Sequence, residues 1–551
     1  MKRALLTISL AALAFCACDK LNTAPQDYYA SGNYWTTVSQ VEGYMPAIYN
    51  QIRNLQFTHQ ITFGELGAGA YVQPVSVSGN SVSNPAIILH TLSDVVPGVT
   101  NWGNYYSALS HINLFIEKTE AAEFMPEAEK AYLLGEAYGL RAFLYFDLYR
   151  IYGGVPLRLI ADVAGHGTSD VNELYLERST ATKTMEQIMA DINKSITCFG
   201  DQKGFDPYGM GNKVHWSKAA TECLGAEVLL WNTKVTVGDY TAKSDGSLLT
   251  QAKTYLNDVV SNYGLALQND FAKVFASDNK ANSEIIYAIH YGEDDGVFNS
   301  NTVYTYPTSA GTFFNRYDKN GNLMTDYLSL KNYCSNHTYE YLPAFYLNYD
   351  GTAEYSKDET KLVDTRAMAS FMPAYDKEGE DLKLVGSIFV KNMGEIIQGA
   401  RRMTGDIPIY RLSWVYLTLA EIANYEGNNA DFVNNINLVR KRAYASDWNV
   451  NVYGAEYKDF ATNELTILSE KDKELLQEGQ RWWDVRRLQT VKGDPSKNII
   501  FSKVSDPVYR VDPSKAAPVI AAGQEFRVLW PIHKTILDND PKLTGHQNPG
   551  Y

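Results

Sequence analysis

Cysteine is scarce in this chain of 551 residues, which holds only five. Cys16 and Cys18 lie close to the N-terminus, and Cys198, Cys223 and Cys334 are widely spaced further on. Disulfide-stapled extracellular domains carry dense, even sets of cysteines, and structural zinc sites carry closely spaced ones. We therefore expect no disulfide framework and no metal site.

Long apolar runs and an excess of positive charge are also lacking. After residue 17 no segment approaches the roughly 20 apolar residues of a transmembrane helix. The formal net charge is −14, and it falls to −16 once Lys2 and Arg3 are left out. Because nucleic-acid binding needs basic surfaces that neutralise phosphates, this balance argues against DNA or RNA as a partner.

Catalytic and cofactor motifs are missing as well. The chain has no His-Glu-x-x-His, no Gly-x-Ser-x-Gly and no Walker loop, so we predict neither a cofactor nor catalysis. Residues 318–322 (DKNGN) begin like a calcium loop. Leu323 replaces the glycine and Ser329 the glutamate that such a loop requires, so we predict a simple turn there.

The first twenty residues carry the clearest signal that is present. Lys2 and Arg3 precede an apolar run over 4–17, and Ala17 stands directly before Cys18. This pattern is typical of a secretory segment that ends at a bacterial lipobox, so we predict that residues 1–17 are removed and that Cys18 is acylated. The alternative is an ordinary signal peptide in which both early cysteines are apolar filler; Cys16 is the weaker anchor because bulky Phe15 precedes it.

Helical periodicity is strong at both ends of the chain. Over 126–150, apolar residues recur at steps of three and four, which predicts a helix with one apolar face that ends at Gly153. Ser217 suits the N-cap of a second helix over 217–232. Further helices are predicted over 410–425, 432–442 and 463–488. With 45% hydrophobic residues, such a chain can bury a large core.

Two stretches differ from these helical regions. Residues 64–101 are rich in Gly, Pro, Ser and Thr, which predicts a long loop with a short hairpin. Residues 291–358 are dense in Tyr and Phe and are punctuated by turn pairs such as Asn320-Gly321. Aromatic loops on a rigid helical scaffold are a common way to build a binding surface.

Several segments, in the same order along the chain, resemble one family. They are WGNYY (102–106), GEAYGLRAF (135–143) continuing to YGGVPL (152–157), GNKVHW (211–216), EIIYAI (284–289), IYRL (409–412), INLVR (436–440), EGQRWWDVRR (478–487) and QNPGY (547–551). This pattern is similar to that of the SusD/RagB nutrient-binding outer-membrane lipoproteins of Bacteroidetes.

The resemblance implies a mainly α fold. Its scaffold would consist of tetratricopeptide-like helix pairs, and an irregular, loop-rich region packed against it would carry the binding surface. No clean 34-residue period is visible in the sequence, so the periodicity alone does not establish these repeats. We expect a leader (1–17), an N-terminal region (18–235) and a C-terminal region (236–551), the last two forming one compact globular unit.

The resemblance also implies a function. Members are lipid-anchored to the outer membrane on its extracellular side, where they capture oligosaccharides and deliver them to a partner SusC-like TonB-dependent transporter. Three alternatives remain: a RagB-like lipoprotein that captures peptides, a purely structural lipoprotein, and a glycoside hydrolase that uses two carboxylates. Binding without catalysis is the expected activity.

The motif residues themselves are predicted to be scaffold. Charged residues within amphipathic helices more often pair internally than contact a ligand, which applies to Glu136 and Arg141. Ion pairs between successive members are expected along the run Glu478, Arg481, Asp484 and Arg487.

Ligand contacts are expected from the two loop stretches instead. Sugar rings stack their C–H faces on aromatic rings, and sugar hydroxyls need amide, carboxylate or guanidinium partners. In the family these contacts vary between members, and the alternative is that most of these aromatics pack beneath their own loops. The candidate residues are Glu65, Tyr71, Asn84, His90, Tyr291, Tyr304, Tyr306, Phe314, Arg316 and Tyr317.

Overall fold

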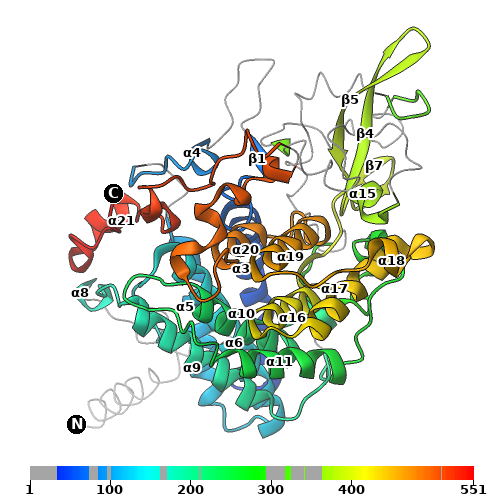
Figure 1. Ribbon diagram of the computed structural model, residues 1–551. Helices are drawn as coiled ribbons and strands as arrows, with labels where there is room; N and C mark the ends of the chain where they lie inside the picture. The colour runs from blue at the N-terminus through cyan, green and yellow to red at the C-terminus, as the bar shows by residue number, and fades with distance from the viewer. Residues whose placement is uncertain are drawn as a thin grey trace, which may run out of the picture.

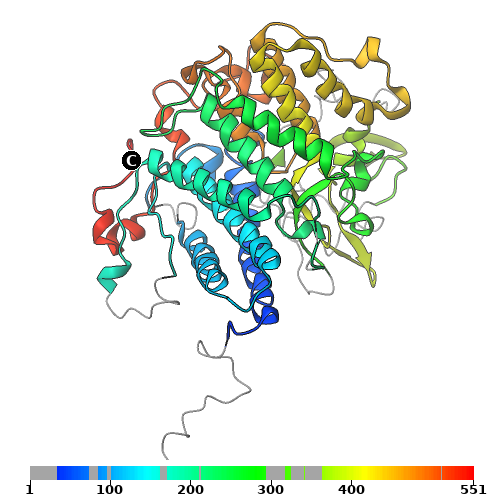
Figure 2. The same ribbon diagram turned by 90° about the horizontal axis from the view of Figure 1, so that it is seen from below.

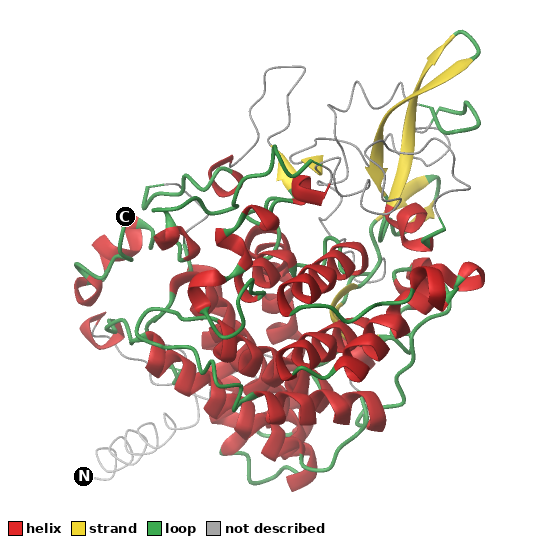
Figure 3. Cartoon of the chain, viewed as in Figure 1, coloured by secondary structure: helices red, strands yellow, loops and turns green. Residues whose placement is uncertain are grey.

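A computed structural model describes residues 34–72, 85–95, 101–161, 171–205, 207–209, 212–292, 317–323, 340–341, 363–510 and 512–551. Most of these residues are helical and few lie in strands, as predicted (Figure 3). Within these ranges, no helix is both long enough and apolar enough to cross a membrane. The leader and Cys18 lie outside the described residues.

Nine helices longer than ten residues stand out in the described part of the chain. They are α3 (Met45–Phe57), α5 (Gly103–Glu120), α6 (Glu127–Tyr152), α9 (Ala181–Phe199), α10 (Lys218–Lys234), α11 (Leu249–Asn262), α16 (Leu412–Glu426), α17 (Asn429–Tyr444) and α19 (Phe460–Glu474). Each packs on the next from α5 to α16, and α16 then contacts both α17 and α19. This serial packing of neighbouring helices, visible in Figures 1 and 2, agrees with the tetratricopeptide-like scaffold that we predicted.

Shorter elements connect and cover these helices. The short α-helices are α2 (Val38–Glu42), α4 (Pro85–Ile88), α8 (Val171–Leu174), α15 (Thr365–Ser370), α18 (Val450–Tyr453), α20 (Arg481–Arg487) and α21 (Lys534–Asn539), and η2 (Thr58–Phe63) is a π-helix. Single turns of 3₁₀-helix occur at Asn212–Val214, Phe271–Val274, Ser277–Asn279, Ala445–Asp447, Pro495–Lys497, Ile499–Phe501, Lys503–Ser505, Pro507–Arg510, Glu525–Val528 and Pro541–Leu543.

Helix α6 begins directly after Pro126 and ends at Gly153, which adopts φ +78°. The prediction of a single apolar face was wrong, because every side chain from Tyr132 to Tyr152 is buried. Neighbouring elements, among them α5, α9 and α10, cover α6, so its charged residues must find partners in the interior. Asp147 does so, with its carboxylate 2.7 Å from Arg150 and 2.6 Å from His59.

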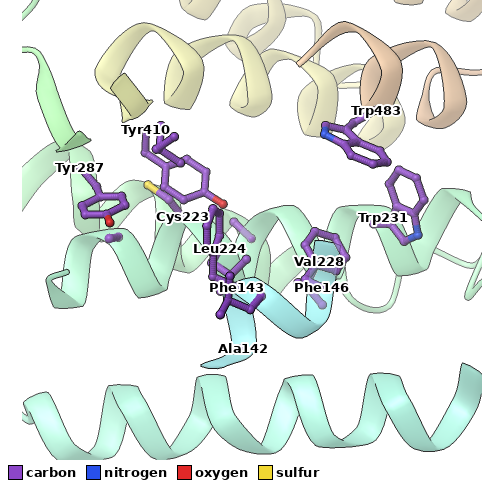
Figure 4. Close-up of a cluster of buried hydrophobic side chains, with 14 of the residues drawn as sticks. Ala142, Phe143, Phe146, Cys223, Leu224, Val228, Trp231, Tyr287, Tyr410 and Trp483 are labelled. Carbon is purple, nitrogen blue, oxygen red and sulfur yellow. The ribbon is translucent and has the colours of Figure 1, made fainter. Parts of the chain in front are cut away.

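The core around α6 and α10 is aromatic. Figure 4 shows Phe143 and Phe146 of α6 facing Leu224 and Val228 of α10. The ring of Trp231 meets Trp483 of α20 edge to face, with the ring centroids 6.1 Å apart. Such edge-to-face pairs stabilise a core beyond the area that they bury.

The cap signals were accurate, whereas several helix boundaries were not, among them that of the helix predicted over 432–442, which spans Asn429–Tyr444. The hydroxyl of Ser217 accepts a hydrogen bond from the Ala220 N–H, as an N-cap should. The helix predicted over 463–488 is interrupted between α19 and α20, where Gln477 and Gly479 adopt positive φ. The helix predicted to begin at residue 410 begins at Leu412, because the preceding residues belong to a strand.

Strands occur as antiparallel pairs. Strand β2 (Ile285–Ile289) pairs with β8 (Ile407–Arg411), and both strands are fully buried. Strands β4 (Phe371–Glu378) and β5 (Asp381–Phe389) form a hairpin, and β6 (Glu395–Ile397) pairs with β7 (Ala400–Arg402). The strands labelled β4, β5 and β7 gather at one end of the molecule, away from most of the helices (Figure 1).

A buried ionic cluster links β8 to the helices behind it. The guanidinium of Arg411 lies 2.7 Å from the Glu284 carboxylate, 2.6 Å from Glu474 and 2.7 Å from Glu478. Arg442 also contacts Glu284 and Glu474. Burial opposes ionisation of Glu474, but the charges of Arg442 and Arg411 outweigh it and hold the pKa of this carboxyl well below its usual range.

Candidate functional site

The two loop stretches predicted to carry the ligand contacts meet in the structure. Strand β1 (Tyr71–Val72) comes from the first stretch and β3 (Glu340–Tyr341) from the second. They pair antiparallel, with Tyr71 opposite Tyr341. The predicted short hairpin within 64–101 was therefore wrong for β1, whose partner is remote in sequence. This pair lies at the same end of the molecule as the β4–β5 hairpin (Figure 1), which we call the loop-rich end.

The first stretch is anchored on the turn between α19 and α20. The Trp482 N–H donates to the Gly64 carbonyl oxygen at 2.8 Å. A Cβ atom on Gly64 would lie 2.2 Å from the Gly479 carbonyl oxygen, so only glycine permits this close approach. The backbone that leads to β1 is thereby held against the helical scaffold.

Glu65 lies inside this anchor and not on the surface where we expected it. Its side chain is 1% exposed, and its Oε1 atom accepts hydrogen bonds from the backbone N–H groups of Gly479 (2.8 Å) and Gln480 (3.3 Å). Burial raises the pKa of Glu65 to about 8, although these hydrogen bonds partly oppose the shift. These contacts give Glu65 a scaffold role, joining the early loop to the turn before α20.

Replacing Glu65 by glutamine is expected to stabilise the protein increasingly as the pH rises from about 5 to 8. The folded-state pKa lies above the ordinary value of 4.5, so the stability that this carboxyl contributes is complete below pH 4.5 and is lost as the pH rises through about 8. Glutamine keeps an oxygen for both backbone donors and cannot ionise. Urea unfolding of both proteins across this range measures the difference.

Glu525→Gln is the control for that series. Glu525 is solvent-exposed, and the backbone N–H of Gly523 lowers its pKa, so its titration falls below this pH range. The difference in free energy of unfolding between Glu525→Gln and the natural chain should stay constant between pH 5 and 8. An equally constant difference for Glu65→Gln would show that Glu65 is ionised in the folded protein throughout.

His90, in the same loop stretch as Glu65, packs against α20. Its ring stacks on Trp482 with the centroids 5.6 Å apart, and its carbonyl oxygen accepts a hydrogen bond from the Arg527 guanidinium. Burial, reinforced by the charge of Arg527, lowers the pKa of His90 to about 4, so the imidazole is neutral at physiological pH. Its backbone has φ +52°, a conformation that non-glycine residues seldom adopt.

Tyr291 is another candidate that the structure places in the interior. Its ring is 4% exposed, its hydroxyl donates to the Gln56 side chain at 3.0 Å, and its N–H donates to Asp406. The ring therefore belongs to the hydrophobic core next to α3, in keeping with the alternative that most of these aromatics are packing residues.

Tyr317 is half-buried and lies in a short described segment of the second loop stretch. Its backbone exchanges two hydrogen bonds, each of 2.9 Å, with Tyr375 of β4. The ammonium of Lys377 lies 5.8 Å from the centre of its ring. The backbone of Tyr317 is thus fixed by the β4–β5 hairpin, and the residue as a whole is half-buried.

The turn after Tyr317 is the simple turn that we predicted. The Asp318 carboxylate accepts hydrogen bonds from the N–H groups of Asn320 and Asn322, and Gly321 has φ +79°.

The side chains of the other predicted ligand contacts are not described. Tyr71 is described by its backbone alone, and the residues outside the described ranges are Asn84, Tyr304, Tyr306, Phe314 and Arg316.

Comparison with known proteins identifies the family. A family model described as "SusD family" matches residues 313–551, and one described as "Starch-binding associating with outer membrane" matches residues 65–222. A crystal structure of a SusD superfamily protein from Bacteroides fragilis is 45% identical, covers 94% of this chain and 100% of its own, and has a TM-score of 0.83. This chain belongs to the SusD/RagB family.

More distant SusD relatives are also similar over nearly their whole length. SusD-like protein P38 of Formosa agariphila is 24% identical over 573 residues, which cover 99% of this chain and 98% of that protein. Surface glycan-binding protein A from Bacteroides uniformis shares the fold, with a TM-score of 0.67 at 16% identity, over 93% of this chain and 99% of that one. The family resemblance that the motifs indicated is confirmed.

The SusD motif residues are structural, as we predicted. Arg141 pairs with Asp191 at 2.7 Å, and Trp482 and Trp483 are each 1% exposed. Of the ion pairs expected between successive members of the run from residue 478 to 487, only that between Asp484 and Arg487 (2.8 Å) is present among the described contacts.

The other members of that run reach across to different elements, because the helix is broken before α20. Glu478 contacts Arg411 and Lys391, and Arg481 lies 3.4 Å from Asp472.

The β4–β5 hairpin was not predicted, although the sequence carries a signal for it. Glu378 pairs with Asp381 across a two-residue loop, and Gly379 in that loop adopts φ +69°. A glycine in a two-residue connection is a standard hairpin signal. This hairpin matters for the candidate site because β4 holds the backbone of Tyr317.

Proposed function

We propose that this protein captures oligosaccharides at the cell surface through its loop-rich end and delivers them to a SusC-like TonB-dependent transporter of the outer membrane. It acts by binding and not by catalysis, and an acyl group on Cys18 anchors it. The observation that carries this proposal is the β1–β3 pair, which joins the two loop stretches predicted to contact the ligand. A fixed scaffold that presents aromatic loops suits the recognition of a polar ligand.

The family supports both the ligand class and the location. The model that matches residues 65–222 is described as starch-binding and as associating with the outer membrane, and a protein of the same fold is named as a surface glycan-binding protein. Tyr317 supports a sugar ligand chemically, since its half-buried ring offers a face for C–H stacking and its hydroxyl can donate and accept.

A thermal-shift screen tests this function. The chain without residues 1–18 is mixed with a panel of oligosaccharides and peptides, and each mixture is also analysed for cleavage products. A ligand at 100 times its Kd should stabilise the fold by about 2.7 kcal/mol. A shift with glycans and no cleavage supports the proposal. A shift with peptides alone supports the RagB-like alternative, cleavage of the glycan supports a hydrolase, and no shift at all contradicts capture by the isolated chain.

Tyr317→Ala is expected to weaken binding of the glycan found in that screen about tenfold and to leave the melting temperature nearly unchanged. Loss of a stacking aromatic removes on the order of 1 kcal/mol of binding free energy, and the backbone hydrogen bonds of Tyr317 to β4 do not depend on its side chain. Titration calorimetry measures the affinity. We expect alanine at Tyr304 or Phe314 to act in the same direction.

Tyr291→Phe is the matched control. It removes a buried hydrogen bond to Gln56, so it should lower the melting temperature while the affinity stays the same. Unaltered affinity in Tyr317→Ala, Tyr304→Ala and Phe314→Ala together would place the binding site elsewhere.

A further inference from the structure

A second region of the molecule has the features of a ligand site, and none of the residues predicted to bind ligand lines it. A cavity of about 620 Å³ lies between the segment that follows α10 and the segment that follows α20. Its volume is within the range of small-molecule sites. Its walls include hydroxyl, carboxylate, guanidinium and aromatic groups, among them Thr241, Ser244, Arg486, Asp494, Phe501 and Glu525.

Arg486 is the unusual member of this set. Its side chain is 2% exposed, and one N–H donates to the Arg150 carbonyl oxygen at 2.6 Å. Among the described residues its guanidinium has no ion pair and no second hydrogen bond, although its backbone carbonyl accepts one from the Asn498 amide. The adjacent Arg487, by contrast, is paired with both Glu421 and Asp484. A guanidinium has five N–H donors, so most of those on Arg486 are left for whatever occupies the cavity that it lines.

The surroundings of Arg486 explain how the charge is tolerated. The guanidinium carbon lies 4.9 Å from the ring centre of Trp231 and 5.7 Å from that of Trp482, which provides cation–π stabilisation. Burial nevertheless lowers the pKa of Arg486 to about 9, and the nearby charge of Arg150 adds to this effect. A ligand that accepts hydrogen bonds from Arg486 would supply acceptors that the described residues do not.

Two carboxylates supply acceptors on the same cavity. Asp494 accepts hydrogen bonds from the Ser496 N–H and hydroxyl through Oδ1, and Glu525 accepts from the Gly523 N–H through Oε1. In each case the second oxygen has no partner among the described residues. Hydrogen bonds from Ser496 lower the pKa of Asp494, so this group is charged at neutral pH. The half-buried ring of Phe501 adds an apolar wall.

We infer that this cavity binds a neutral sugar unit, with its hydroxyls between Arg486 and the two carboxylates and a C–H face against Phe501. A sugar hydroxyl accepts from a guanidinium and donates to a carboxylate, so one neutral ligand satisfies both kinds of group. An anion would meet repulsion from Asp494 and Glu525, and a simple cation would meet the charge of Arg486. This site is additional to the loop-rich end and does not depend on the ligand captured there.

Calorimetric and saturation-transfer NMR titrations with single sugars test the inference. The probes are glucose, galactose, mannose and N-acetylglucosamine, with glucuronate and glycine as charged comparisons. At least one neutral sugar should bind the natural chain, and the double variant Asp494→Asn/Glu525→Gln should weaken that binding at least about tenfold. Both amides keep the oxygen that accepts the local N–H, so the double variant should melt normally.

Arg486→Lys, which keeps the charge but loses the fork of donors, should weaken the same binding, whereas Tyr317→Ala should leave it unchanged. Three results would overturn the inference: no neutral sugar binds, sugar binding is indifferent to both cavity variants, or a charged probe binds in preference. Tighter glucuronate binding in the double variant would identify an anion site, and glycine binding would identify an amino-acid site. Tyr317→Ala reports on the loop-rich end alone. A failure of sugar binding in the cavity can therefore be distinguished from a failure of glycan capture at the loop-rich end.

Discussion

Arg411→Ala is expected to destabilise the protein by about 3–5 kcal/mol, which is a large part of the stability of a typical domain. The side chain is 1% exposed, and its three nitrogens contact carboxylates from three separate segments. Those carboxylates belong to Glu284 before β2, Glu474 at the end of α19 and Glu478 in the turn before α20. Removing the cation leaves buried negative charges with too few partners.

The partners that remain cannot compensate fully. Arg442 still contacts Glu284 and Glu474, and Lys391 still contacts Glu478 at 2.5 Å. Burial lowers the pKa of Lys391 to about 8, so its charge is itself costly to maintain. Arg411→Lys should therefore also be strongly destabilising, because a single ammonium cannot reproduce the bridging geometry of the guanidinium.

Lys534→Ala is the matched control for a surface ion pair. Lys534 and Asp538 are 3.0 Å apart on α21, and each side chain is 56% exposed. Such a pair contributes less than about 0.5 kcal/mol, so this variant should unfold at nearly the natural urea concentration. If Arg411→Ala and Lys534→Ala had similarly small effects, the buried cluster would not hold these segments together.

The parts of the fold that were predicted correctly are those with local signals. The N-cap at Ser217 and the stop at Gly153 depend on neighbouring backbone atoms, so the sequence contains the necessary information. Whether a helix is covered on one side or on all sides depends on elements remote in sequence. The periodicity of α6 predicted one buried face, but α5, α9 and α10 all pack against it. Buried Asp147 and Arg150 are tolerated because they pair with each other.

The candidate site was only partly predictable for the same reason. The composition of each loop stretch marked it as irregular, but the β1–β3 pairing joins residues about 270 positions apart, and no local pattern specifies such a partner. Glu65 and Tyr291 have side chains suited to sugar binding. They are buried because they contact residues remote in sequence, Gly479 in the turn before α20 and Gln56 of α3, and the sequence does not reveal these contacts. Arg486 was missed as a candidate because its neighbours in sequence are paired scaffold residues.

Cys18→Ala is expected to move the protein almost completely from the membrane fraction to the soluble fraction of the expressing cell. Among the described residues, no helix is long and apolar enough to cross a membrane. Each buried methylene of an acyl chain contributes about 0.8 kcal/mol, so a cysteine that carries several chains holds the protein at the membrane effectively permanently. Incorporation of labelled palmitate and fractionation after a high-salt wash measure the two effects.

Cys16→Ala separates the lipobox from the alternative in which both cysteines are apolar filler. Acylation at Cys18 predicts that Cys16→Ala keeps both the label and the membrane location, since Ala17 and Cys18 remain intact. If Cys18→Ala kept the label, the anchor would lie elsewhere. If neither variant lost membrane association, residues 1–17 would be an ordinary leader, and attachment would have to come from contact with a membrane partner. If Cys18→Ala loses the label and the membrane location and Cys16→Ala keeps both, Cys18 is the anchor. That result supports a binding protein that stays tethered to the membrane while it delivers its ligand to the transporter.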